Sequence, residues 1–127
     1  MKKVLIVDDA RFVRFSIKMI LENLGFEIVG EAENGSEAVK MYHELKPDIV
    51  TMDISMPEDD GIEAIRLIKK IDKNAKIIVI ASLEENQRIG EAMHEGAVAY
   101  IIKDFKEEGS TYSYYFKNEG SDIRGRK

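Results

Sequence analysis

The sequence predicts an α/β domain built on a parallel sheet, and three observations support this. Five short aliphatic runs alternate with segments whose apolar residues recur at helical spacing. The runs are continuous rather than alternating, which is typical of strands buried on both faces of a parallel sheet. The connections are brief, so each strand–helix–strand unit forms a right-handed crossover. We therefore expect a doubly wound sheet of five parallel strands with helices on both faces.

Residues up to 46 contain the first two predicted strand–helix units. Val4–Val7 is a buried strand that ends at two aspartates, and an amphipathic helix follows with its apolar stripe from Val13 to Leu24. Gly25 ends that helix. Ile28–Glu31 is a second, short strand, and the stripe in Ala38–Leu45 predicts a second helix that a proline terminates.

The same alternation continues through three more strands. Asp48–Asp53 is a strand, and the isoleucines of Ile62–Ile71 predict the helix after it. Lys76–Ile80 is the most apolar strand, followed by a helix through Ile89–Met93 that a glycine closes. Ala99–Ile102 is the fifth strand.

The chain changes character after residue 103. The 24 residues from 104 to 127 contain five of the ten aromatic residues but one aliphatic residue, Ile123. High strand propensity favours an extended segment at Thr111–Phe116, and the glycines and mixed charge of Asn118–Lys127 predict disorder. We expect a core domain over residues 1–103 and an atypical segment over 104–127 in place of a fifth helix.

Composition excludes several classes of function. A chain of 127 residues has room for one ordinary domain. The net charge of −5 argues against a nucleic-acid-binding surface, and the absence of cysteine excludes disulfides and thiolate metal sites. The apolar run near the N-terminus is too short for a signal peptide or a membrane span, so we expect a cytoplasmic protein that does not bind membranes.

Polar residues gather where the predicted strands end. Asp8 and Asp9 follow the first strand, Asp53 ends the third, Ser82 follows the fourth and Lys103 ends the fifth. The carboxyl ends of parallel strands open on one edge, so these side chains converge. Two like charges at about 4 Å repel by roughly 4 kcal/mol at an effective dielectric near 20, so the aspartates need a cation or a proton. An all-oxygen cluster suits Mg²⁺, beside which a carboxylate can attack phosphorus.

These residues resemble the receiver domain of two-component response regulators. The likeness covers residues 1 to about 103, and the short chain is similar to stand-alone chemotaxis-type regulators. It implies a flavodoxin-like sheet with strand order 2-1-3-4-5. The residues that carry it are Asp8-Asp9, the string Met52–Pro57 (Met-Asp-Ile-Ser-Met-Pro), Asp60-Gly61, Ser82, Tyr100 and Lys103.

The resemblance implies a phosphorylation site and a metal site. Asp53 is the expected acceptor of a phosphoryl group from a histidine kinase. Asp8, Asp9 and Asp53 are expected to hold Mg²⁺ together with the backbone carbonyl of Ser55, and Lys103 is expected to contact the phosphoryl oxygens. The chain is then not an enzyme beyond its own phosphotransfer and dephosphorylation.

The resemblance also implies how a signal leaves the site. Ser82 is expected to contact the phosphoryl group and Tyr100 to turn inward behind it, which changes the face formed by the fourth helix and fifth strand and recruits a downstream effector protein. Ser55 and Glu84 match positions that tune the lifetime of the phosphoryl group in the family. Arg11 and Arg14 are expected to be exposed helix residues that touch a kinase.

Two departures from the family pattern carry expectations of their own. Asp104 follows Lys103 where the family usually has proline, so we expect a trans peptide bond there. Without a fifth helix, one flank of the sheet is expected to be uncovered, which invites dimerisation or segment exchange through the tail.

Other functions remain open at the level of sequence. A phosphohydrolase with an aspartate nucleophile would need an acid–base carboxylate where Ser55 stands, and an FMN protein would need a phosphate-binding loop where the two aspartates stand. A receiver-like scaffold with impaired phosphorylation, or a receiver fragment of a transcriptional regulator, fits the same residues.

Overall fold

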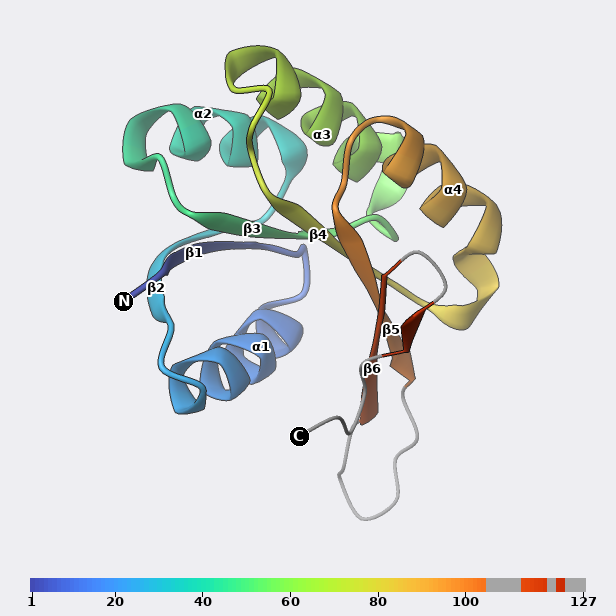
Figure 1. Cartoon of the computed structure of the whole chain (residues 1–127), viewed down its shortest axis with the longest axis horizontal. Coiled ribbons are helices and arrows are strands. Elements are labelled where there is room, and N and C mark those ends of the chain that lie inside the picture. The colour runs from blue at the N-terminus through green and yellow to red at the C-terminus, as the bar shows by residue number, and fades with distance from the viewer. Residues whose placement is uncertain (105–112, 119–120, 123–127) are drawn as a thin grey trace.

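A central sheet separates two layers of helices in the computed structural model (Figure 1). The structure describes residues 1–104, 113–118 and 121–122, without the side chains of 59, 83, 104 and the residues from 113 onward. The elements in chain order are β1 (Lys3–Val7), α1 (Arg11–Asn23), β2 (Glu27–Ala32), α2 (Gly35–Leu45), β3 (Ile49–Asp53), the short 3₁₀ turn η1 (Pro57–Asp59), α3 (Asp60–Ile71), β4 (Ile77–Ala81), the 3₁₀ turn η2 (Leu83–Glu85), α4 (Asn86–His94), β5 (Ala99–Asp104), β6 (Ser113–Asn118) and β7 (Ser121–Asp122).

The sheet confirms the predicted fold class and strand order. The strands lie in the order β2-β1-β3-β4-β5-β6-β7, and the first five are parallel. Val7 pairs with Met52 and Asp53 pairs with Ile80, so the carboxyl ends of β1, β3 and β4 reach the same edge. The chain order reverses direction across β1 and β3, which is where this class of sheet binds its ligands.

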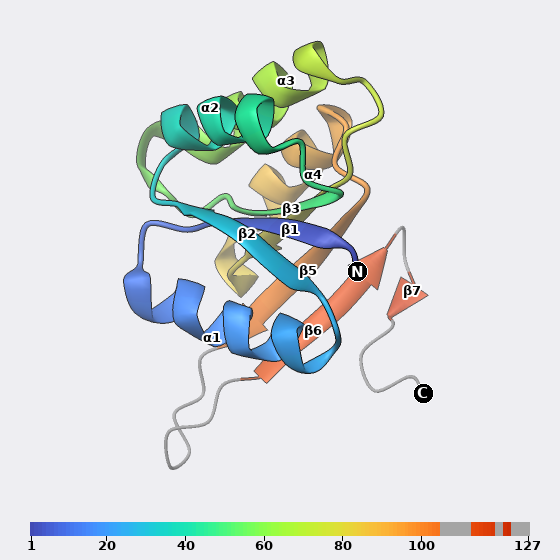
Figure 2. The same cartoon turned by 90° about the vertical axis from the view of Figure 1, so that its left-hand side faces the viewer.

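The two faces of the sheet have separate cores. Helices α2, α3 and α4 cover one face and α1 covers the other (Figures 1 and 2). Val4 and Ile6 of β1 pack with Val13 and Ile17 of α1, whereas Leu5 belongs to the larger cluster under α2–α4. Val4–Val7 alternate between the two clusters, which explains why all four residues are apolar. No helix in the described part of the chain is long and apolar enough to cross a bilayer.

The end of the chain extends the sheet. Strand β6 pairs antiparallel with β5, and β7 pairs antiparallel with β6. The predicted extended segment is confirmed over Ser113–Phe116, and its residues 111 and 112 lie outside the described residues. The prediction of disorder is wrong at Asn118 and at Ser121–Asp122, because backbone pairing orders them, and its other residues are not described.

Strand β5 and its flank also differ from expectation. β5 runs through Asp104, two residues beyond the predicted end, since its backbone pairs with β6 as far as Ser113. None of the described peptide bonds is cis, which confirms the trans bond expected after Lys103. The expected exposed flank is wrong at Ile80 and Ile101, which face the α1 side and are buried.

Candidate functional site

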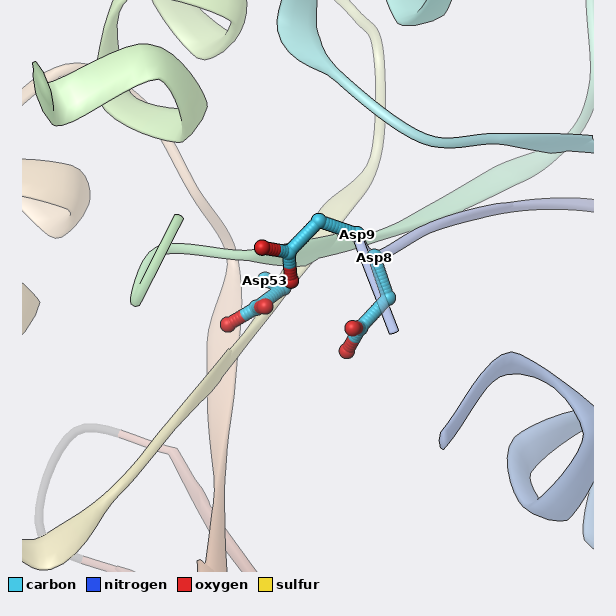
Figure 3. Close-up of side chains that lie close together, drawn as sticks. All are labelled: Asp8, Asp9 and Asp53. Atoms are coloured by element: carbon cyan, nitrogen blue, oxygen red, sulfur yellow. The ribbon is translucent and has the colours of Figure 1, made fainter. Parts of the chain in front are cut away.

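Three carboxylates meet at the carboxyl edge of the sheet. Asp8 follows β1, Asp9 is the next residue, and Asp53 is the last residue of β3. One oxygen of each lies within 4.8 Å of the others. Figure 3 shows the three side chains gathered together. Asp8 and Asp53 are buried, and Asp9 is exposed. The parallel pairing of β1 with β3 explains how residues 45 positions apart in the chain share one pocket.

Lys103 supplies the opposing charge. Its Nζ lies 3.6 Å from Asp8 Oδ2 and 3.6 Å from Asp53 Oδ1, and its side chain is 9% exposed. The pairing of β4 with β5 brings the end of β5 to the same edge, so the lysine reaches both carboxylates without a proline after it. One ammonium against two buried carboxylates leaves an excess of negative charge.

The excess charge perturbs Asp8. Burial and, next, the charge of Asp53 raise the pKa of Asp8 to about 6, although the hydrogen bond from the backbone of Ala10 and the charge of Lys103 pull it down. Asp8 Oδ1 accepts that hydrogen bond from Ala10 N at 2.9 Å. Asp8 Oδ2 is buried and accepts no hydrogen bond from the described residues. The Lys103 ammonium lies 3.6 Å from this oxygen, which can also bind a cation.

The donor set fits Mg²⁺. All the candidate ligands are carboxylate oxygens, which a hard divalent cation prefers, and the three aspartates offer one oxygen each. The unsatisfied, buried Oδ2 of Asp8 supports the same reading, because buried polar atoms normally have partners. A dication at this position would offset the charge that Lys103 leaves uncompensated.

Ser55 fixes the orientation of Asp53. Its backbone N–H donates to Asp53 Oδ1 at 2.8 Å and its hydroxyl donates to the same oxygen at 2.5 Å. With Lys103, all the contacts described for Asp53 therefore fall on Oδ1. The other oxygen, Oδ2, is left for chemistry or for a metal.

The start of α3 packs directly against the last residue of β3. A Cβ on Gly61 would lie 2.4 Å from the carbonyl oxygen of Asp53, a distance that no real side chain tolerates. Glycine at this position is what lets α3 approach the end of β3. The adjacent Asp60 accepts a hydrogen bond from the backbone N–H of Gly35, which joins the starts of α2 and α3.

The other predicted residues lie after β4 and within β5. Ser82 follows β4, is half-buried and makes no side-chain cap to the turn η2. Glu84 is exposed in η2. Tyr100 is half-buried in β5 and packs against the larger core cluster. The structure thus joins Asp8, Asp53, Ser55 and Lys103 through direct contacts and, among the described residues, none of these contacts involves Ser82, Glu84 or Tyr100.

Arg14 was missed as a part of the site. Its Nη1 donates to the backbone carbonyl of Asp8 at 2.7 Å, and its Nε donates to Glu31 Oε1 at 3.0 Å. The expectation of an exposed Arg14 is wrong, because its side chain is 11% exposed, whereas Arg11 is exposed as predicted. Arg14 follows buried Val13 in α1, and only the structure shows that α1 lies close enough to Glu31 to bury it.

Comparisons with known proteins agree on the family. The family model for the response regulator receiver domain matches residues 4–111. The chemotaxis protein CheY of Thermotoga maritima is 55% identical over 105 residues, which cover 83% of this chain and 88% of that protein.

Solved structures give the same answer. The response regulator domain of Thermotoga maritima CheB matches with a TM-score of 0.75 and 42% identity, over 81% of this chain and 78% of that one. CheY in the CheX–CheY–BeF₃–Mg²⁺ complex of Borrelia burgdorferi matches with a TM-score of 0.74 and 39% identity, over 83% and 80%. Together with the carboxylate cluster and the strand order, these matches show that the chain belongs to the response regulator receiver domain family.

Proposed function

We propose that this chain is a phosphorylation-controlled signalling switch in which Asp53 accepts a phosphoryl group from the phosphohistidine of a histidine kinase. One observation supports it above the others: a buried aspartate at a strand end lies 3.6 Å from a buried lysine and within 4.8 Å of two more carboxylates. That arrangement offers a nucleophile, a cation site and a fixed positive charge in one pocket.

The proposed reaction transfers the phosphoryl group in one displacement. Asp53 Oδ2 attacks phosphorus, the P–O bond forms as the P–N bond to the kinase histidine breaks, and the imidazole leaves with its electron pair and takes a proton from solvent. Asp8, Asp9, Asp53 and the carbonyl of Ser55 would hold Mg²⁺, which would neutralise charge on the phosphoryl oxygens. Lys103 donates to a phosphoryl oxygen, which its distance from Asp53 supports.

The proposed output uses the neighbouring strand ends. Ser82 donates to the phosphoryl group, and Tyr100 repacks behind it, so that the face formed by α4 and β5 changes and binds an effector protein. Ser82 directly follows β4, Tyr100 lies in the paired strand β5, and both side chains are half-buried, which supports this role. Ser55 and Glu84 set the lifetime of the phosphoryl group, and the hydrogen bond from Ser55 to Asp53 supports the role of the first.

Intact mass spectrometry tests the proposal. The native chain, Asp53→Asn and the control Asp48→Asn, which lies at the opposite edge of the sheet, are incubated with acetyl phosphate and with or without Mg²⁺. We expect a Mg²⁺-dependent gain of one phosphoryl group in the native chain and the control, and none in Asp53→Asn.

Three outcomes contradict it. A gain that persists in Asp53→Asn would assign the modification to another residue. No gain in any variant would favour a receiver-like scaffold without phosphorylation. Release of many equivalents of phosphate per chain would instead indicate a phosphohydrolase.

A further inference from the structure

Arg14 is a buried cation that the proposed reaction does not use. Its side chain is 11% exposed, and burying a charge is costly unless the charge has partners. The guanidinium has two: Nη1 donates to the carbonyl oxygen of Asp8 at 2.7 Å, and Nε donates to Glu31 Oε1 at 3.0 Å. Arg14 therefore connects the residue that follows β1 with strand β2.

The carbonyl that Arg14 holds belongs to the peptide group between two candidate metal ligands. A peptide group is planar, so fixing the carbonyl oxygen of Asp8 also fixes the direction of the N–H of Asp9. Both residues belong to the cluster in which one oxygen of each carboxylate lies within 4.8 Å of the others. The contact from Arg14 thus acts on the backbone from which both of these side chains start.

The contacts of Asp8 with β2 form a closed ring. The backbone N–H of Asp8 donates to the carbonyl oxygen of Ala32 at 3.0 Å, and Ala32 directly follows Glu31 in β2. Strand β2 therefore holds the N–H side of Asp8 directly and its carbonyl side through Arg14. Because a guanidinium is planar and rigid, the pairing of Nε with Glu31 sets the direction in which Nη1 points.

We infer that Arg14 is a positioning residue for the cation site and that Glu31 acts through it. Arg14 contacts the backbone of Asp8 and leaves its carboxylate to Lys103 and the cation. By holding the peptide group between Asp8 and Asp9, it keeps both carboxylates turned toward Asp53. This inference rests on the Mg²⁺ site of the proposed function.

A positioning role and a purely electrostatic role predict opposite changes in Mg²⁺ affinity. The positive charge of Arg14 repels a cation, so removal of that charge alone would make Mg²⁺ bind more tightly. Loss of the contact with Asp8 would instead weaken binding, because the two carboxylates would no longer be held in place. A residue that only anchors α1 would change the stability of the fold and leave the Mg²⁺ affinity of the folded chain unchanged.

Titration of the full chain with MgCl₂, followed by ¹H–¹⁵N correlation spectra at about pH 8, tests the inference, and the same spectra show whether each variant is folded. We expect Arg14→Met to weaken Mg²⁺ binding by about 10- to 100-fold, the usual loss when a residue that orients a metal ligand is removed. Arg14→Lys keeps the charge without the planar fork and is expected to weaken binding as well. The control Arg66→Met removes an exposed arginine that pairs with Glu95 on the surface, and we expect no change from it.

A double variant tests the role of Glu31. Glu31→Ala is expected to weaken Mg²⁺ binding by about threefold, and the double variant is expected to bind no more weakly than Arg14→Met alone, because no guanidinium remains for Glu31 to orient. Losses that add in the double variant would show that Glu31 acts through its own charge, which would overturn its role.

The titrations separate failure of this inference from failure of the proposed function. A folded Arg14→Met that binds Mg²⁺ as tightly as the native chain, or more tightly, would overturn the inference and leave the cation site intact. If Arg14→Met does not fold, unchanged affinity in both Arg14→Lys and Glu31→Ala would overturn it equally. A native chain that does not bind Mg²⁺ would overturn the proposed cation site and this inference with it.

Discussion

Asp8 shows how one side chain couples the site to pH. It is buried beside Asp53, and one ammonium serves both carboxylates. Burial is the main reason that the pKa of Asp8 rises to about 6 from an ordinary value of 3.8. The folded protein therefore binds a proton at Asp8 at a pH where the unfolded chain does not. Protonation of Asp8 stabilises the fold fully below about pH 3.8, and this contribution is lost as the pH rises through about 6.

We predict that, without Mg²⁺, lowering the pH from 7 to 5 increases the free energy of unfolding by about 1 kcal/mol through protonation of Asp8. Urea denaturation at several pH values measures it. The variant Asp8→Asn should lose this part of the pH dependence, because its amide does not titrate. If the free energy of unfolding of the native chain and of Asp8→Asn changes equally with pH, titration of the buried Asp8 does not cause the pH dependence.

The residue scale is also where sequence reasoning succeeded and failed most clearly. The carboxylates and Lys103 could be predicted because their convergence follows from the ends of parallel strands alone. Arg14 could not, because its burial depends on how closely α1 approaches Glu31 of β2, and no sequence pattern gives that distance. Its contact with the carbonyl of Asp8 ties α1 to the site.

At the scale of elements, the contact between α3 and β3 controls the position of Asp53. The backbone of α3 approaches Asp53 so closely that Gly61 has no space for a Cβ. The sequence predicted α3 from its isoleucines, but the closeness of the approach came from the structure. Similarly, β5 could not be predicted to its full length, since its last two residues are ordered by pairing with β6 and not by their own pattern.

We predict that Gly61→Ala lowers the free energy of unfolding by about 2 kcal/mol, because α3 must move away from the carbonyl of Asp53. Gly90→Ala is the matched control: Gly90 lies in α4, where an added Cβ meets nothing within 4 Å, so alanine should stabilise the helix by up to about 1 kcal/mol. Urea denaturation of both variants measures the difference. Equal effects of the two substitutions would mean that α3 adjusts without strain.

At the scale of the whole molecule, the fold and the site place opposite demands on the chain. The parallel sheet could be predicted because continuous apolar runs fit strands that are buried on both faces. The strand order of this sheet brings the three carboxylates together. The extension by β6 and β7 could not, because a segment rich in tyrosine has no periodicity that fixes its pairing partner. Because the strand order brings the three carboxylates to one edge of the sheet, negative charge gathers there. Lys103 offsets only part of this charge.

A divalent cation should therefore stabilise the whole fold. We predict that Mg²⁺ raises the midpoint of thermal unfolding, and that at about 100 times its dissociation constant it adds about 2.7 kcal/mol, because the unfolded chain lacks the assembled carboxylates. Differential scanning calorimetry with increasing MgCl₂, followed by EDTA, measures the gain and its reversal. NaCl at equal ionic strength is the control for screening, and Asp8→Asn is the control for the site. An equal gain with NaCl, or an undiminished gain in Asp8→Asn, would show that the cation acts elsewhere, since Asp8 offers a bound ion its buried Oδ2, which accepts no hydrogen bond from the described residues.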